Sequence, residues 1–344
     1  MRIALDATYS AGEQLSGVGV YSQEILAAMA AAHPEVQFLF CYRPHRLARS
    51  LRAKLPPNAR RRLLQEPIVP RSDLFHGLNQ RLPRARFHRS VTTFHDLFVL
   101  TQEYSTPEFR RRFAEQARDA AARSDLIICV SQFTADQVEA LLGVPRKRLR
   151  VVHHGVHAPL DPPPASAREP IVLHVGAIQK RKNIVRLIEA FERMPAGWRL
   201  VLAGSRGFGA EEIVGRIEKS SCRERIEAPG YVNPQALQAY YARASILSFP
   251  SLDEGFGIPV IEAMAAGLPV VASARPSIVE AAGDAAVLVD PASADELAAA
   301  LIKLAADVHL REDLARRGRI RSMAFTWAEA ARKTWDVYCE LGIA

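Results

Sequence analysis

The sequence predicts an α/β protein made of two doubly wound domains, each with a parallel sheet. Its 344 residues are long for one hydrophobic core and fit two domains of roughly 150 residues each. Short apolar runs alternate with helical patterns along the chain, as expected when helices cover both faces of parallel sheets. Residues 158–170 contain five prolines, which exclude regular structure and indicate a domain boundary.

These patterns predict the domain limits and the elements in order. We expect a first domain over 1–160, a Pro-rich linker over 161–170, a second domain over 171–325 and a C-terminal helix over 326–344 that crosses back to the first domain. Expected strands, from their short apolar runs, are 3–5, 36–40, 74–76, 91–94, 126–130, 171–175, 199–203, 225–228, 246–249 and 269–272. Expected helices, from their helical patterns, are 18–31, 107–122, 134–142, 184–193, 210–219, 295–306 and 327–341, with another capped by Asn233 and opened by Pro234.

The segment 249–272 is the most informative about function. Pro259 suits the first position of a short helix, which places Glu254 in the preceding loop and Glu262 in the first turn. The free N–H groups of a helix start attract anions, typically phosphate. A sugar nucleotide lying across this helix start would bring Glu262 to a ribose diol and Glu254 to a sugar. Two acids near a helix start are otherwise ordinary partners of the helix dipole.

Basic residues follow the expected strand 171–175. Lys180, Arg181 and Lys182 come at a strand-to-helix turn, the edge at which such folds bind phosphate, and Asn183 is expected to cap the next helix. Cations there would face a diphosphate and offset its charge as it departs. A solvated basic loop is the alternative explanation.

The segment from Glu254 to Val271 resembles the E-x7-E signature of retaining glycosyltransferases of family 4, which have the GT-B fold. The resemblance implies two Rossmann-like domains facing a central cleft. It also implies that Arg181 and Lys182 contact the diphosphate and that a Gly-rich loop at Gly17 and Gly19 approaches it. By itself that loop is a weak signal, and without a third glycine NAD binding is not expected. The donor-binding residues implied are Gly17, Gly19, Arg181, Lys182, Tyr231, Val232, Glu254, Gly255, Phe256, Gly257 and Glu262.

A His-Asp pair follows the expected strand 91–94. His95 can hydrogen-bond a hydroxyl or transfer a proton near neutral pH, and the pair resembles the family motif whose His touches the transferred sugar. The implied catalytic residues are therefore His95, Glu254, Arg181 and Lys182. Asp96 and Ser131 are candidate sugar or acceptor contacts, and Thr134 is expected to cap the helix that follows. A purely structural His-Asp pair is the alternative.

The uneven distribution of charge along the chain indicates which kinds of partner it can bind. Residues 1–165 carry 23 Lys and Arg against 15 Asp and Glu, which gives 23 − 15 = +8, whereas residues 166–344 carry 22 of each. An anionic acceptor or an anionic membrane surface fits this basic half, and the arginines of helix 107–122 are candidates for that contact. Nucleic acid is not expected, because the arginines are not interleaved with aromatic residues.

Cofactors and compartment follow from what the chain does not contain. The four cysteines show no C-x-x-C spacing and no Asp-x-Asp motif lies at a suitable strand end, so neither a metal nor another cofactor is expected besides the sugar nucleotide. Met1 leads straight into a buried-strand pattern, and no apolar run approaches the roughly 18 residues of a membrane span. We expect a cytoplasmic protein, with peripheral contact to the inner face of the membrane as an addition.

The function expected is transfer of a hexosyl group, with retention and without metal, from a nucleoside-diphosphate sugar to a glycan or a lipid-linked saccharide. The family resemblance favours mannose from GDP-mannose. Two alternatives stay open: a sugar-nucleotide epimerase with GT-B-like architecture, and a sugar-nucleotide-binding protein without catalysis.

Overall fold

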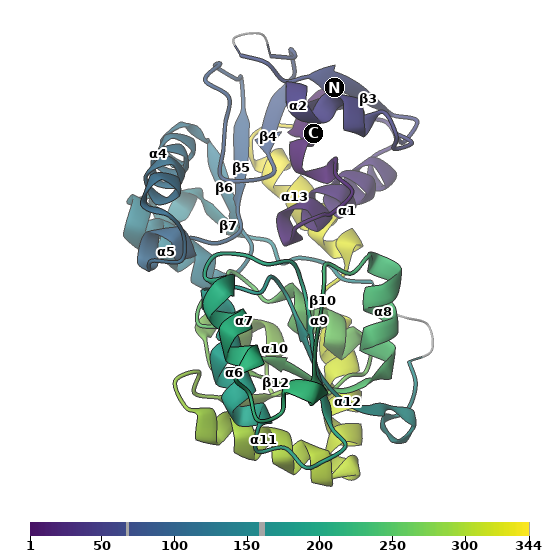
Figure 1. The fold of residues 1–344 in the computed structure, drawn as a ribbon. Helices are drawn as coiled ribbons and strands as arrows, with labels where there is room; N and C mark the ends of the chain where they lie inside the picture. Colours follow the sequence, from purple (N-terminus) through teal and green to yellow (C-terminus); the bar gives the residue numbers. More distant parts are fainter. Residues whose placement is uncertain (67–68, 158–161, 344) are drawn as a thin grey trace. The chain divides into compact units, whose positions relative to one another are not determined.

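The protein consists of two compact units, each an open parallel sheet with helices on both faces (Figure 1). The computed structural model describes residues 1–66, 69–157 and 162–343. The first unit comprises Met1–Gly155 and Thr326–Ala344, and the second comprises Val156–Phe325. Residue 161 of the expected linker, together with 158–160 before it, lies outside the described residues.

The first unit has a seven-stranded sheet in the order β3-β2-β1-β4-β5-β6-β7, with every pair of neighbours parallel. Its strands are β1 (Arg2–Asp6), β2 (Gln37–Tyr42), β3 (Ala59–Leu63), β4 (Leu74–Gly77), β5 (Ser90–Phe94), β6 (Leu126–Cys129) and β7 (Leu149–Val151). Its helices are α1 (Gly17–Ala32), α2 (Pro44–Ser50), α3 (Phe98–Thr101), α4 (Pro107–Arg123), α5 (Gln132–Leu142) and α13 (Trp327–Glu340).

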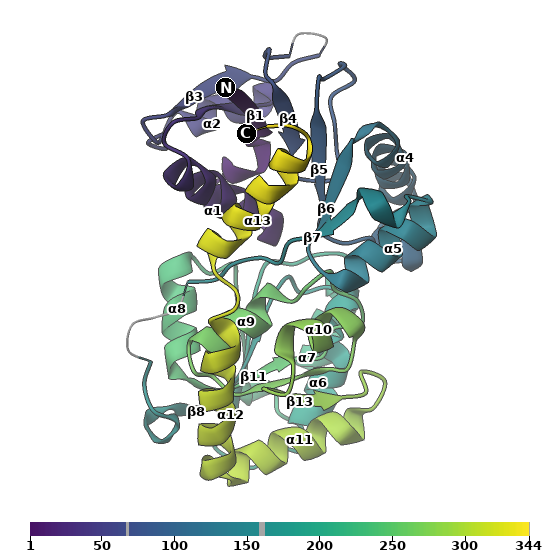
Figure 2. The same cartoon turned by 180° about the vertical axis from the view of Figure 1, so that it is seen from behind.

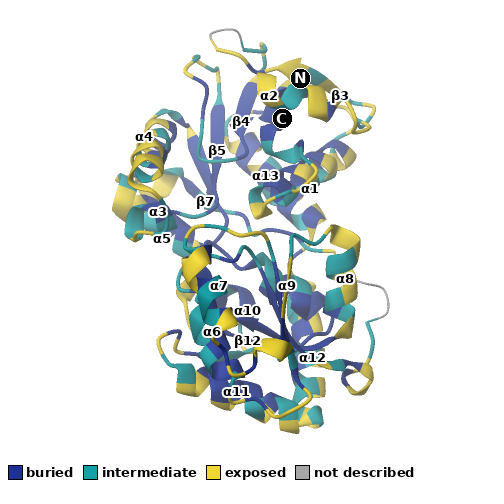
Figure 3. Ribbon diagram, viewed as in Figure 1, coloured by how far each residue is buried: buried dark blue, intermediate teal, exposed yellow. Residues whose placement is uncertain are grey.

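Alternation along the strands divides the core of this unit between the two faces of the sheet. Ile3 and Leu5 of β1 pack in the core formed with α1 and α13, whereas Ala4 between them packs in the core formed with α4 and α5. The strands inside the sheet are therefore buried on both faces, and exposed residues gather on outer helix surfaces such as that of α4 (Figure 3).

The C-terminal helix α13 completes the first unit. It lies beside α1 (Figure 2), and its Glu340 carboxylate accepts hydrogen bonds from Arg150 at the end of the chain's first segment. Gly155 marks the point at which the first segment meets this helix. A Cβ on Gly155 would lie 2.2 Å from the backbone nitrogen of Trp327, so only glycine fits there.

The second unit has a six-stranded sheet in the order β10-β9-β8-β11-β12-β13, again parallel throughout. Its strands are β8 (Glu169–Val175), β9 (Arg199–Ala203), β10 (Ile226–Gly230), β11 (Ala244–Phe249), β12 (Val270–Ser273) and β13 (Val287–Val289). Its helices are α6 (Ile184–Phe191), α7 (Ala210–Glu218), α8 (Pro234–Arg243), α9 (Ile258–Ala265), α10 (Pro276–Ala282), α11 (Ala294–Ala306) and α12 (Val308–Ser322).

This architecture confirms the doubly wound α/β fold. The sequence patterns missed the strands β3, β7 and β13, each of which lies at the edge of its sheet. Edge strands are not buried on both faces, and β3 reads Ala-Arg-Arg-Arg-Leu, so no apolar run reveals it. Helix α12 was also missed, because its run of arginines obscures the few buried positions Leu314, Gly318 and Ser322.

Three local predictions were wrong. The cap of α5 is Ser131, whose Oγ accepts from Thr134 N, so Thr134 lies inside the helix. Asn183 takes a left-handed conformation with φ 58° and its side chain does not cap α6. Its amide instead donates to the carbonyls of Pro250 and Pro291. Helix α9 begins at Ile258, so its first turn contains no acid and Glu262 lies in its second turn.

Candidate active site

In the second unit, the charged residues that were predicted to bind the donor lie at the point where the strand order of the sheet reverses. Strands β8 and β11 are neighbours in the sheet, but the chain runs from β8 outward to β9 and from β11 outward to β12. The loops after two such strands diverge and leave a crevice at their carboxyl ends, where ligands bind in open α/β sheets. The loop after β8 carries Arg181 and Lys182, and the loop after β11 carries Glu254.

These three side chains form one buried ion cluster. Glu254 Oε2 lies 2.8 Å from Arg181 Nη1, and Glu254 Oε1 lies 2.5 Å from Lys182 Nζ. The three residues are only 7–8% exposed. Burial by itself raises the pKa of Glu254, but the charges of Arg181 and Lys182 outweigh burial and hold that pKa at about 2. The carboxylate is therefore ionised at neutral pH, and the cluster carries a net charge of +1.

Backbone contacts fix the cluster in place. Arg181 also donates to the carbonyl of Asp253, and Ser277 Oγ donates to the carbonyl of Glu254 at 2.6 Å. Lys182 Nζ lies 4.7 Å from the centre of the Phe249 ring, at the end of β11. A cation pair held this rigidly is suited to binding the oxygens of a phosphate. Ser277 follows β12 at the same sheet edge, which is the signal that could have marked it in the sequence.

Glu262 lies on α9 and has a partner that the sequence patterns missed. Tyr241 on α8 donates its hydroxyl to Glu262 Oε2 at 2.8 Å. Burial raises the pKa of Glu262 from 4.5 to about 7, against the lowering effects of the Tyr241 hydroxyl and of His157. Burial and the neighbouring Glu262 keep the pKa of Tyr241 well above 10, so its hydroxyl stays protonated. The pair can offer a ribose diol a carboxylate whose orientation is fixed.

The remaining expected donor contacts occupy turns of the same unit. Gly257 has φ 102° and precedes the first residue of α9, a conformation that favours glycine. Phe256 is buried and its ring packs edge to face on Phe325, with the ring centres 5.4 Å apart, so its side chain belongs to the core. Tyr231 and Val232 follow β10 and are half-buried. Gly255, like Glu254, lies in the loop before α9.

In the first unit, His95 follows β5 directly. Its Nε2 donates to the carbonyl of Leu78 at 2.9 Å, and the Tyr21 ring packs edge-on against it at 4.6 Å between ring centres. Burial lowers the pKa of His95 to about 4 despite that hydrogen bond. The ring is therefore neutral at pH 7 with its proton on Nε2, which leaves Nδ1 as an acceptor. His95 can accept a hydrogen bond from a hydroxyl, whereas proton donation near neutral pH is disfavoured.

The other expected residues of the first unit differ in their surroundings. Gly17 and Gly19 lie in the first turn of α1, which Ser16 caps by accepting from Gly19 N. A Cβ on Gly19 would lie 2.9 Å from the Tyr9 carbonyl, whereas one on Gly17 would meet no atom of the described residues within 4 Å. Asp96 lies beside His95 and is half-buried, and Ser131 is fully buried as the cap of α5.

A buried hydrogen-bond chain behind His95 was not predicted. His76 Nδ1 lies 2.6 Å from the Tyr338 hydroxyl of α13, and His76 Nε2 lies 2.9 Å from Thr93 Oγ1. Thr93 also bonds the hydroxyl of Tyr21 at 3.1 Å. The C-terminal helix is thereby linked to the ring that packs on His95. His154 stacks on His95 with ring centres 5.4 Å apart, which agrees with a structural role for His154.

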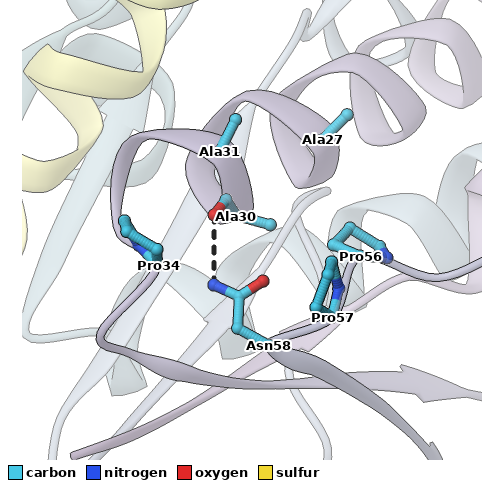
Figure 4. Close-up of a pocket in the computed structure, with 7 residues that line it drawn as sticks. All are labelled: Ala27, Ala30, Ala31, Pro34, Pro56, Pro57 and Asn58. Carbon is cyan, nitrogen blue, oxygen red and sulfur yellow. Dashed lines mark hydrogen bonds between the residues drawn. The ribbon is translucent and has the colours of Figure 1, made fainter.

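One cavity of the first unit lies away from these residues (Figure 4). It measures about 370 Å³ and is lined by Ala27, Ala30, Ala31, Pro34, Pro56, Pro57 and Asn58. The only polar side chain of this lining, that of Asn58, donates to the carbonyl of Ala30 at 3.0 Å. The cavity therefore offers no group suited to catalysis.

Two features are absent from the residues that the structure describes. No group of three or more His, Cys, Asp or Glu in residues 1–66, 69–157 and 162–343 is arranged to hold a metal ion. Over the same residues, no helix combines the length and the apolar character needed to cross a membrane.

The similarity of this chain to known proteins identifies it as a glycosyltransferase. Residues 161–321 match the family Glycosyl transferases group 1, and residues 15–158 match Glycosyltransferase Family 4. The chain is 30% identical over 281 residues to the O-antigen chain mannosyltransferase B of Escherichia coli, covering 77% of this chain and 74% of that protein. This chain therefore belongs to the group 1 glycosyltransferases, which confirms the resemblance drawn from residues 254–271.

Solved structures confirm the GT-B fold. The sucrose-phosphate synthase of Thermosynechococcus elongatus matches with a TM-score of 0.80 and 25% identity, covering 99% of each chain. HepE of Anabaena in complex with UDP-glucose matches with a TM-score of 0.75 and 18% identity, covering 99% of this chain and 100% of that chain. The family matches and the mannosyltransferase relative favour a transferase over the two alternatives, an epimerase and a binding protein without catalysis.

Proposed function

We propose that this glycosyltransferase moves a hexosyl group, with mannose the first candidate, from a nucleoside-diphosphate sugar to a saccharide acceptor, with retention and without a metal ion. The observation that supports it most is the buried cluster of Arg181, Lys182 and Glu254 at the strand switch point of the second unit. It joins two cations suited to a diphosphate with a carboxylate suited to a sugar hydroxyl. Mannosyltransferases among the relatives support mannose.

Each group has a role that follows from its chemistry. Arg181 and Lys182 bind the diphosphate and stabilise the negative charge that grows on it as the bond to the sugar breaks. Two fixed cations supply the stabilisation that a metal ion would otherwise give, which supports metal independence. Glu262 accepts hydrogen bonds from the ribose hydroxyls. Glu254 orients the sugar, and the acceptor then attacks from the face that the diphosphate leaves, which retains the configuration.

His95 is proposed to accept a hydrogen bond from the transferred sugar through Nδ1. Its low pKa supports this role, because a neutral imidazole with Nε2–H committed to Leu78 presents a lone pair on the other nitrogen. Gly17 is proposed to let the backbone come close to the diphosphate, since no side chain of the described residues fills the space in front of it. Asp96 and Ser131 stay candidates for sugar or acceptor contacts.

The acceptor is proposed to be a glycan or a lipid-linked saccharide with anionic character. The basic excess of residues 1–165 supports this proposal. On α4, Phe109 is 40% exposed and the guanidinium of Arg112 lies 5.6 Å from its ring centre, a pairing of apolar and cationic groups that suits a lipid-phosphate surface. A cytoplasmic protein that touches the membrane from that side would meet such an acceptor.

The test is to incubate the purified protein with GDP-mannose, UDP-glucose or UDP-N-acetylglucosamine, with and without EDTA. Slow hydrolysis releasing the nucleoside diphosphate indicates a transferase, and NMR of the first sugar anomer released reports retention. Conversion of the donor to its epimer would identify an epimerase, and binding without release of diphosphate would identify a binding protein. Loss of activity in EDTA that added Mg²⁺ restores would refute metal independence.

A pair of variants tests the cation assignment. Lys182→Met should lower turnover by orders of magnitude, because the buried cation that faces the diphosphate is removed. Lys180→Met, in the same turn but with an exposed side chain, is the matched control and should keep near-normal turnover. Equal activity of the two variants would refute the role of Lys182.

A further inference from the structure

Glu262 is held by a contact that no sequence motif specifies. The Tyr241 hydroxyl donates to Glu262 Oε2 at 2.8 Å, and Tyr241 is only 5% exposed. Glu262 Oε1 has no hydrogen-bond partner among the described residues. The terminal torsion of a glutamate side chain is soft, so a carboxylate without such a contact samples a broad range of orientations. The hydroxyl of Tyr241 removes this freedom and occupies one lone pair of Oε2, which leaves Oε1 and the second lone pair of Oε2 available to a ligand.

Tyr241 is itself held at its backbone. Arg168 donates to the Tyr241 carbonyl at 2.7 Å and to the Ala266 carbonyl, just past the end of α9, at 2.5 Å. One guanidinium thus ties the last turn of α8 to the end of α9, the helices that carry Tyr241 and Glu262. At the other end, Asn233 caps α8 by accepting from Ala236 N. The relative position of the hydroxyl and the carboxylate is therefore set by the fold of the second unit.

We propose that Tyr241 is a positioning residue that orients the Glu262 carboxylate toward both hydroxyls of a ribose, and so makes the site select ribonucleotides over deoxyribonucleotides. This inference rests on the proposed function, in which Glu262 reads the ribose of the donor. A carboxylate with both oxygens in the plane of a vicinal diol can accept two hydrogen bonds at once. When the carboxylate rotates freely in the free protein, part of the binding free energy of these two hydrogen bonds is lost, because binding must order the side chain.

The charge of Glu262 gives a second readout. Its pKa of about 7 lies near neutral pH, and the Tyr241 hydroxyl lowers it. Since only the ionised carboxylate accepts from both hydroxyls, binding of a ribonucleotide should weaken as the pH falls below about 7. Without the Tyr241 hydroxyl, this weakening should begin at a higher pH.

Few other charged groups act on this carboxyl. His157, from the segment before β8, favours the charged form. Arg168 reaches the end of α9 from the other side. From α12, Arg319 packs against Gly267, beyond the C-terminal end of α9. The Arg168 and Arg319 contacts do not involve the Tyr241 hydroxyl.

The experiment compares binding of UDP with 2′-deoxy-UDP, and of GDP with 2′-deoxy-GDP, by calorimetry at pH 8 and across pH 5.5–8.5. The variant is Tyr241→Phe. Tyr240→Phe, which removes a hydroxyl from the preceding position of α8, is the matched control. Tyr241→Met fills a similar volume without a hydroxyl and replaces the first variant if that one does not fold.

The wild type and Tyr240→Phe should prefer the ribonucleotide by on the order of tenfold or more, the usual effect of a hydrogen bond to a charged group. Tyr241→Phe should lose most of this preference by weakening ribonucleotide binding alone, and its pH profile should shift upward. Equal weakening of both nucleotides, or an unchanged preference, would overturn the inference.

If the wild type bound neither UDP nor GDP, the proposed function itself would fail. Binding without a preference would refute the ribose role of Glu262 and the inference with it.

Discussion

Replacing Glu254 by Gln tests whether the carboxylate holds the cation pair together. The substitution keeps the size of the side chain but removes the negative charge that faces Arg181 at 2.8 Å and Lys182 at 2.5 Å. Two buried cations would then lie together without the charge of Glu254. Breaking a buried pair in this way costs about 3–5 kcal/mol, and a unit of this size loses roughly 2–4 °C of Tm per kcal/mol, so Glu254→Gln should melt about 6–20 °C lower.

A nucleoside diphosphate should reverse much of this loss. It brings negative charge to the two cations, so its stabilisation of Glu254→Gln should exceed its stabilisation of the wild type. Differential scanning fluorimetry with and without UDP or GDP measures both effects. A nucleotide concentration of ~1 mM exceeds a typical Kd. Transfer should nevertheless be lost, because the contact of Glu254 with the sugar is removed. Glu218→Gln, an exposed acid on α7, is the control and should leave Tm unchanged.

The pH dependence provides an independent check. The pKa of Glu254 is about 2 in the folded protein, below its usual 4.5, so the stability that it contributes is present above pH 4.5 and is lost as the pH falls toward 2. The Tm difference between wild type and Glu254→Gln should therefore narrow below pH 4.5. A variant with unchanged Tm, or with a ligand-induced shift no larger than that of the wild type, would refute the reasoning.

Three further substitutions follow from the structure. Arg168→Met leaves the buried carbonyls of α8 and α9 without their shared donor and should cost about 3 kcal/mol of unfolding free energy, measured by urea denaturation; a change below about 1 kcal/mol would contradict it. Tyr338→Phe removes the 2.6 Å partner of His76 and should cost about 1–2 kcal/mol in the same assay. Little loss is expected from the control Tyr9→Phe, because the hydroxyl of this half-buried tyrosine has no hydrogen-bond partner among the described residues. Gly17→Ala should keep Tm, because its Cβ meets nothing among the described residues within 4 Å, yet weaken diphosphate binding measured by calorimetry; normal binding would refute the assignment of Gly17.

The sequence alone predicted the doubly wound fold and the family. Strands buried on both faces are mostly apolar, so β6, β8 and β9 are visible as short hydrophobic runs. The acids at 254 and 262 keep a fixed spacing because one loop and one helix carry both. Three of the four edge strands, β3, β7 and β13, and the arginine-rich α12 escaped, since partial burial imposes no clear pattern on their residues.

Only the tertiary structure decided how these side chains pair. Glu254 meets Lys182 across 72 positions of sequence, and His76 meets Tyr338 across 262, because neighbouring strands and the returning α13 bring distant segments together. No local pattern encodes such a contact. Burial likewise set the protonation states, with the pKa of His95 lowered to about 4 and that of Glu262 raised to about 7. The sequence determined which residue types follow the carboxyl ends of the strands. The three-dimensional packing determined the partners and the charge of these residues.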